Sequence, residues 1–153
     1  MRFSPLLAVT SAVVALGACA AGDRPATGDT TAAQTVSAAN VEMAVRVASP
    51  ADGDTVSLPF TLRLEATGVE VLAVNGINEP GKGHHHLVID ADAPSDTLPL
   101  APAPIVIHLG NGATERVIDS LTPGPHRIIA IFAGGTHVPQ TGVTRDTITV
   151  VVR

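Results

Sequence analysis

Apolar and polar residues alternate along several short segments of this chain. A period of two is the pattern of a β-strand with one buried face. The clearest example is segment 60–66, in which Phe60, Leu62 and Leu64 alternate with Thr61 and Arg63. Further strands are predicted at 43–47, 84–90, 105–109, 114–118, 126–132 and 146–152, with a weaker one at 69–74. No segment of 41–153 shows convincing helical periodicity.

Turn-forming residues separate these segments at short intervals. Gly110-Asn111-Gly112 lies between two strand segments, and Asn-Gly tolerates positive φ, so a hairpin is predicted there. The proline-rich stretch 93–104 cannot pair as a central strand and is predicted to be a crossing loop or a sheet edge. Seven or eight short strands predict an all-β fold: a single immunoglobulin-like antiparallel β-sandwich over residues 41–153.

The N-terminus has the pattern of a bacterial lipoprotein signal peptide. Arg2 precedes an apolar run, 6–16, that is too short to span a bilayer. The run ends in Leu16-Gly17-Ala18-Cys19, which resembles the lipobox, so we expect removal of residues 1–18 and lipidation of Cys19. The alternative is a simple secretory signal with an incidental cysteine.

The position after the cysteine and the segment that follows it bear on location. Ala20 is not the aspartate that retains similar lipoproteins at the inner membrane. Residues 19–40 carry almost no large apolar side chains and are predicted to be a flexible tether behind the lipid. We therefore expect an exported protein, lipid-anchored to the outer membrane and facing the periplasm, or at the cell exterior.

Composition excludes several classes of partner. The net charge is −5, so the chain offers no basic surface for nucleic acid. It has no Trp and no Tyr, which argues against carbohydrate binding because sugar sites usually need aromatic platforms. The single cysteine rules out a disulfide within the chain.

Half of the six histidines stand together as His84-His85-His86. On a strand His84 and His86 share one face, where two imidazoles can chelate a transition metal, and His85 takes the other. We predict that His85 packs at the core edge with one nitrogen bonded to backbone. His108 should leave the core face, and His137 lies in a glycine-rich loop. The candidate metal ligands are therefore His84, His86, His108 and His137, and imidazole without thiolate favours zinc or Cu(II).

The remaining histidine has a structural interpretation. In Pro123-Gly124-Pro125-His126 the ring is predicted to bond back to the preceding turn at a sandwich corner, with Asp119 as a nearby carboxylate. No nucleophile elbow, His-Glu-x-x-His helix or phosphate loop is present, so we expect a binding module and not an enzyme.

A second interpretation of the histidines stays open. Their rings could bond loop carbonyls and carboxylates such as Asp90 or Asp92, and the protein would then be a structural or partner-docking domain of the cell envelope. Ile129 and Ile131 bear on it, because they are apolar on the face opposite the core side of their strand. Either that face is covered or it is a contact patch.

Four ordered motifs resemble a known bacterial family. They are Gly-x-Gly-His-His-His-Leu-x-Ile-Asp at 81–90, His-x-Gly-x-Gly-x-Thr-Glu at 108–115, Pro-Gly-x-His at 123–126 and His-Val-Pro at 137–139. Together they resemble the domain of unknown function 4399. The opening at 49–59 looks like that of many bacterial immunoglobulin-like modules. The resemblance implies a fold and a location and leaves function open. Gln140 and Val106 depart from the pattern, standing where relatives carry further histidines.

Overall fold

The computed structural model describes residues 41–153, which form nine β-strands and contain no helix. The strands are β1 (Ala44–Ser49), β2 (Thr55–Val56), β3 (Phe60–Thr67), β4 (Glu70–Val71), β5 (Lys82–Ile89), β6 (Val106–His108), β7 (Glu115–Ile118), β8 (Gly124–Ala133) and β9 (Asp146–Val152). The predicted signal peptide (1–18), the lipidation site Cys19 and the tether (19–40) lie outside the described residues.

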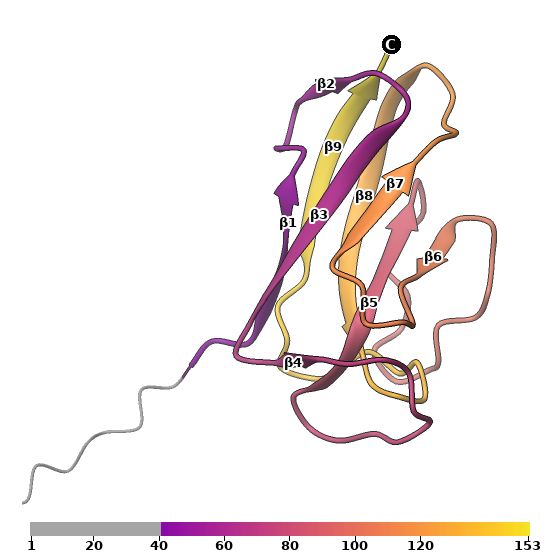
Figure 1. Ribbon diagram of the computed structural model, residues 1–153. Coiled ribbons are helices and arrows are strands. Elements are labelled where there is room, and N and C mark those ends of the chain that lie inside the picture. Colours follow the sequence, from indigo (N-terminus) through magenta and orange to yellow (C-terminus); the bar gives the residue numbers. More distant parts are fainter. Residues whose placement is uncertain (1–40) are drawn as a thin grey trace, which may run out of the picture. The chain divides into compact units, whose positions relative to one another are not determined.

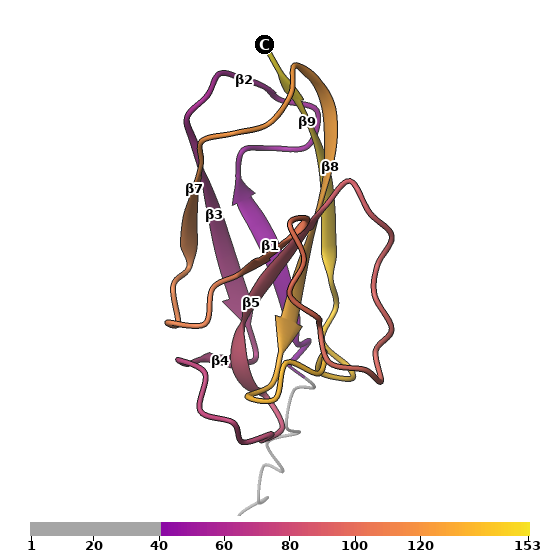
Figure 2. The same ribbon diagram turned by 90° about the vertical axis from the view of Figure 1, so that its right-hand side faces the viewer.

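These strands form two sheets, so the predicted all-β class is confirmed (Figure 1). One sheet has the order β1-β3-β7, and the other has the order β2-β9-β8-β5-β4 with β6 also paired to β5. Figure 2 shows them as two layers, with β3 and β7 on one side and β8 and β9 on the other. The second sheet is not purely antiparallel, because the two-residue strands β2 and β4 join it in parallel.

The predicted hairpin around Gly110-Asn111-Gly112 is wrong. β6 pairs with β5 in one sheet and β7 pairs with β3 in the other, so the connection crosses between the layers. The local turn does form: Gly112 has φ of 77° and donates its N–H to the carbonyl of Leu109. Asn-Gly determines where the chain reverses, whereas the burial of apolar faces determines which strands pair.

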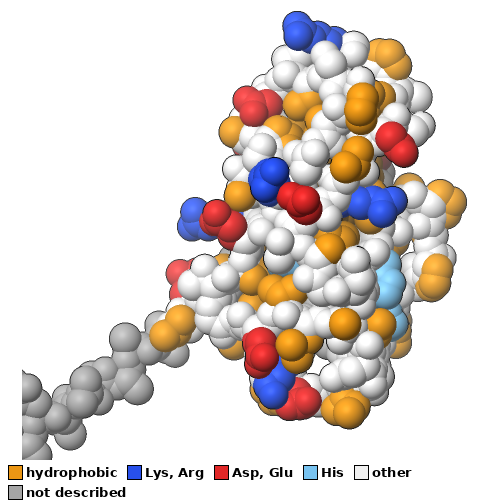
Figure 3. Space-filling model, viewed as in Figure 1, with side chains coloured by type: hydrophobic (Ala, Val, Ile, Leu, Met, Phe, Trp, Pro, Cys, Tyr) orange, Lys and Arg blue, Asp and Glu red, His pale blue; other side chains and the backbone are white. Residues whose placement is uncertain are grey.

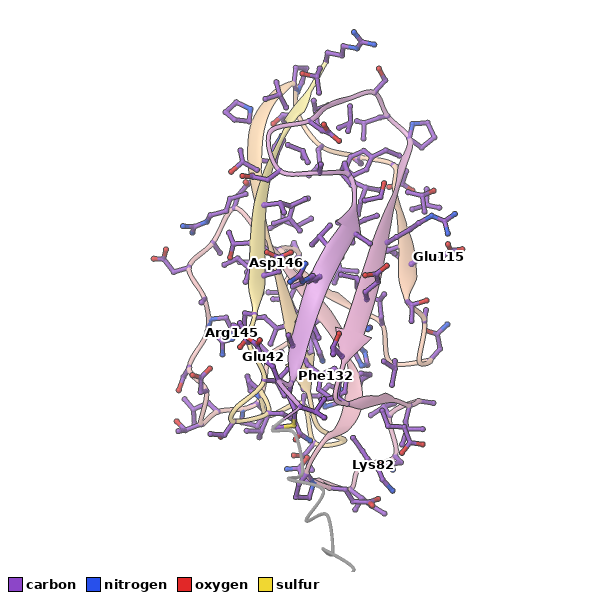
Figure 4. All side chains as sticks on the ribbon, turned by 90° about the vertical axis from the view of Figure 1, so that its left-hand side faces the viewer. Glu42, Lys82, Glu115, Phe132, Arg145 and Asp146 are labelled. Carbon is purple, nitrogen blue, oxygen red and sulfur yellow. The ribbon has the colours of Figure 1, made fainter. Side chains whose placement is uncertain are left out.

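The main core fills the space between the two sheets. β3 contributes Leu62 and Leu64, and β8 contributes Ile128 and Phe132, all of them buried. Phe132 lies in the interior between the layers (Figure 4). β3 therefore buries one face only, as its predicted alternation indicates.

A second, smaller apolar cluster covers the outer face of β5 and β8, and we call it the outer core. It consists of Val88, Ile129, Ile131, Ala133 and, from the loop at 90–105, Leu100. The apolar second face of β8 is thus covered by the protein's own chain and is not a free contact patch. The prediction of a loop at 93–104 is confirmed, since no strand lies between β5 and β6.

Contacts at several points tie this proline-rich loop (residues 90–105) to the domain. Arg145, just before β9, forms an ion pair with Asp96 (Figure 4). The N–H of Leu100 donates to the carbonyl of His137 at 2.9 Å. Because Leu100 is only 6% exposed, its side chain is the apolar anchor of the loop.

Replacing this anchor should loosen the loop. We expect Leu100→Ala to lower the free energy of unfolding by about 2–4 kcal/mol, through lost burial and an unfilled cavity. Leu98→Ala is the matched control, because Leu98 lies in the same loop and is 64% exposed. Its effect should stay within about 0.5 kcal/mol. Urea unfolding of both variants measures this, and equal losses would contradict the anchor role.

Candidate metal centre

β5 separates the histidine triplet between two interiors. In the register with β8, His84 lies opposite Ala133, His86 opposite Ile131, and His85 opposite Phe132. His84 and His86 therefore share the outer-core face, and His85 points to the main core. All three are at most 1% exposed. Gly83 allows this close pairing, because a Cβ there would meet the carbonyl oxygen of Ala133 at 2.1 Å.

β6 brings His108 to the same face. The strand pairs antiparallel with β5 and places His108 directly opposite His86, the position from which side chains on one face of a sheet interact. Gly110 makes room for the ring, since a Cβ at that position would lie 2.2 Å from its Cε1 atom. The glycine of the His-x-Gly motif is thus required by the conformation of the histidine before it.

The loop after β8 supplies His137. Gly134 N–H donates to the carbonyl of Val138, so the chain folds back immediately beyond the strand. His137 has φ of 67°, a left-handed conformation that few residues other than glycine adopt. Its N–H donates to the Gly134 carbonyl at 2.8 Å, and its own carbonyl accepts from Leu100. Hydrogen bonds at both the N–H and the carbonyl of His137 hold its backbone in this unfavourable conformation, which directs the ring towards β5. Backbone strain of this kind concentrates at functional sites.

We call His84, His86, His108 and His137 the histidine cluster. One nitrogen of each ring lies within 4.8 Å of one nitrogen of every other. The Nε2 atoms of His84 and His86 are 3.0 Å apart, and those of His108 and His137 are 3.3 Å apart. All six pairs of ring centroids lie between 4.7 and 5.5 Å. Figure 3 shows histidine side chains reaching the surface beside apolar ones, as expected from the exposure of His108.

The surroundings favour the neutral form of His84, His86 and His108. Burial, followed by the neighbouring histidines, lowers the pKa of His84 to about 4 and that of His86 to about 3. Burial and His137 also lower the pKa of His108. The ring that binds a metal is the neutral one, so at neutral pH no proton has to leave before coordination.

The buried rings lack partners within the part of the chain that the structure describes. The Nδ1 atoms of His84 and His86 have no hydrogen-bond partner, and their Nε2 atoms are hydrogen-bonded to each other. The carboxylates of Asp90 and Asp92 point elsewhere: Asp90 binds His126 and the N–H of Arg127, and Asp92 binds the Arg127 guanidinium. The carboxylates considered above as partners of the rings are therefore engaged with other residues.

His85 differs from its expectation in one respect. It is buried against Phe132, with the ring centroids 5.8 Å apart. Neither of its ring nitrogens has a hydrogen-bond partner among the described residues, so the expected bond to backbone is absent. Burial lowers the pKa of His85 to about 4, because the main core offers nothing to stabilise the charged form.

His126 bonds back to the preceding turn, as the corner motif suggests. Its Nε2 lies 2.7 Å from the carbonyl oxygen of Thr122. Its Nδ1 lies 2.6 Å from a carboxylate oxygen of Asp90, and the expected partner, Asp119, takes no part. These two acceptors raise the pKa of His126. The ring lies at the far end of β8 from Ala133, roughly 23 Å along the strand, and does not belong to the histidine cluster.

Gln140 holds the loop before the triplet, a role that the sequence did not reveal. Its Oε1 accepts from the N–H of Gly81 at 2.9 Å, and its Nε2 donates to the carbonyls of Glu79 and Lys82. Three bonds from one amide fix the chain where it enters β5. The role of Gln140 can be recognised only in the folded chain, where its side chain faces three backbone groups.

The fold and the site together define an all-β domain with a four-histidine centre beside a small outer core. Residues 62–153, more than half of the chain, match the family described as "Domain of unknown function (DUF4399)". The chain belongs to this family. No curated protein and no solved structure gave a significant match. In the described residues no helix is long and apolar enough to cross a membrane.

The neutral histidines predict acid sensitivity of the metal-free protein. In the unfolded chain these histidines have the ordinary pKa of 6.5 and are protonated below that pH. In the folded chain His84 and His85 become protonated only near pH 4. Stability should therefore fall as the pH drops from about 6.5 towards about 4. His126 does not produce this fall. Because its pKa is raised in the folded state, it contributes its full stabilisation below pH 6.5, and this stabilisation is lost at higher pH.

Urea unfolding of the metal-free protein between about pH 7 and pH 5 measures this effect. His86→Gln should flatten the slope, since it removes one buried titrating ring. A midpoint that stays constant over that interval would show that the rings are protonated in the folded state, contrary to the expectation.

Proposed function

We propose that this protein binds a transition metal ion through His84, His86, His108 and His137. The observation that carries the proposal is the convergence of four imidazoles from three separate parts of the chain within 4.8 Å. Two of these rings, His84 and His86, are fully buried, and their Nε2 atoms face each other at 3.0 Å. A hydrogen bond between two neutral imidazoles uses the lone pair of only one of these nitrogens, whereas a bound cation would give both lone pairs a partner.

The spacing of the nitrogens fits a small divalent ion. A tetrahedral centre with metal–nitrogen bonds of about 2.0–2.1 Å separates its nitrogens by about 3.3 Å. Two pairs of the cluster have their Nε2 atoms 3.0 and 3.3 Å apart. A small inward movement of the rings in the other pairs would complete the set. All four ligands are imidazoles and none is a thiolate or thioether, which favours zinc or Cu(II) over Cu(I).

The proposal includes the setting of the site. An exported protein, lipid-anchored through Cys19 to the outer membrane, would present the domain to the periplasm or cell exterior. The two facing sheets support an immunoglobulin-like sandwich as the scaffold. We assign binding rather than catalysis, because the cluster contains no carboxylate that could act as a general base beside the metal.

Metal titration tests the central claim. The purified metal-free chain should bind one zinc or Cu(II) ion per molecule in isothermal titration calorimetry, with a Kd below about 10 μM. His108→Gln should weaken binding about tenfold or more, because one of four ligands is lost. This position suits the test since His108 is exposed, so its replacement leaves the interior intact.

His126→Gln is the matched control, with the same substitution at a histidine outside the cluster, and it should bind metal like the unmodified chain. His86→Gln, checked for folding by circular dichroism, adds a buried ligand position. Binding weaker than about 10 μM, or the same affinity in the His108 and His126 variants, would refute the metal centre.

Lipidation is tested separately. We expect the unmodified protein to label with palmitate and to fractionate with membranes, and Cys19→Ser to lose both properties, because the lipid is attached through the cysteine sulfur. Ala21→Ser, two residues away, should label and fractionate normally. A Cys19→Ser protein that remains in the membrane fraction would show that something other than this lipid holds it there.

A further inference from the structure

The histidine cluster forms one wall of a cavity. The cavity has a volume of about 480 Å³ and is lined by three of the four cluster members, His86, His108 and His137. The rest of its lining is an apolar wall formed by Leu100, Pro102, Ala103 and Val106, from the proline-rich loop and the start of β6. Sites for small organic ligands have volumes of about 300–1,000 Å³ and combine apolar walls with a few polar groups.

The charges around the cavity restrict what it can hold. None of the seven lining residues is an acid, a lysine or an arginine. A divalent ion held by four neutral imidazoles would keep its full charge of two, with no carboxylate in the cluster to offset it. An uncompensated charge beside apolar walls is unfavourable, so an anion from outside the chain would be stabilised at the metal.

The apolar wall favours an anion with an apolar body. Leu100 is buried and lines both the outer core and the cavity, while Ala103 and Val106 are half-buried and present methyl groups to it. Because the lining offers no cation for a second negative group, polyanions such as phosphate esters are disfavoured. A single negative head at the histidines and a short apolar chain against the loop match both walls.

We propose that the metal-loaded centre binds a small apolar monocarboxylate, whose carboxylate adds to the four imidazoles as a fifth ligand of the metal and whose hydrocarbon part fills the cavity under the proline-rich loop. This inference rests on the proposed metal binding and adds a ligand class to the same site. It makes the loop the element that selects the ligand, and the histidines the elements that hold the metal.

The test uses the chain loaded with Cu(II), whose visible absorption and electron paramagnetic resonance spectra report its ligands. Hexanoate should change these spectra at a concentration about 10- to 100-fold lower than acetate, because each additional methylene is buried in the cavity. Hexanol, which has a similar chain without the charge, should leave the copper spectra unchanged.

Two variants locate the effect. Ala103→Trp fills the cavity and should abolish the preference for hexanoate over acetate without changing the spectrum of bound copper. Leu98→Trp, in the exposed part of the same loop, should keep the preference. As a second readout, hexanoate should shift the methyl NMR signals of Val106 and Ala103 in the zinc-loaded chain.

The possible failures are distinguishable. A chain that binds neither zinc nor copper overturns the metal centre together with this inference. A chain that binds copper but responds to hexanoate and acetate at the same concentration overturns the monocarboxylate site alone. Preference that survives Ala103→Trp would also overturn it, because the apolar selectivity would then come from outside the cavity.

Discussion

The structure depends on the position of β5 between two apolar interiors. It pairs with β8 on one side and with β6 and β4 on the other, so its backbone groups are satisfied in the sheet. The main core covers one face and the outer core the other. From Gly83 to Ile89 the strand is buried on both faces, and three consecutive histidines must then be divided between two buried environments.

That constraint explains the chemistry of the site. Desolvation keeps the rings of His84 and His86 neutral, and the same burial shields their Nδ1 atoms from solvent. The remaining two rings come from segments held by other contacts: β6 is held by its pairing with β5, and the His137 loop by turns and by the bond from Leu100. Leu100 therefore joins the outer core, the proline-rich loop and the backbone of one candidate ligand, so the metal centre and the adjacent cavity share one support.

The local patterns of the sequence predicted the elements well and their partners poorly. Alternation located β3 and β9, and the prolines of the loop correctly excluded a strand there, because both depend on neighbouring residues only. The predicted hairpin failed since the turn at Gly112 is local whereas pairing is not. Gln140 stands where relatives carry a histidine, and its side chain forms hydrogen bonds that hold the loop before β5. This role depends on residues about sixty positions away.

By itself, the sequence determined the all-β class and the division of the triplet into His85 and the pair His84 and His86, because the two-residue period of a strand is a property of its own backbone. Only the tertiary structure decided that His108 and His137 join the pair, since this requires the particular neighbours of β5 and a left-handed residue in the loop after β8. It also decided that the second face of β8 is covered, because Leu100 reaches it from a loop whose own sequence shows no periodic pattern. Which distant segments meet is determined by the burial of apolar surface throughout the domain, and no single stretch of sequence specifies it.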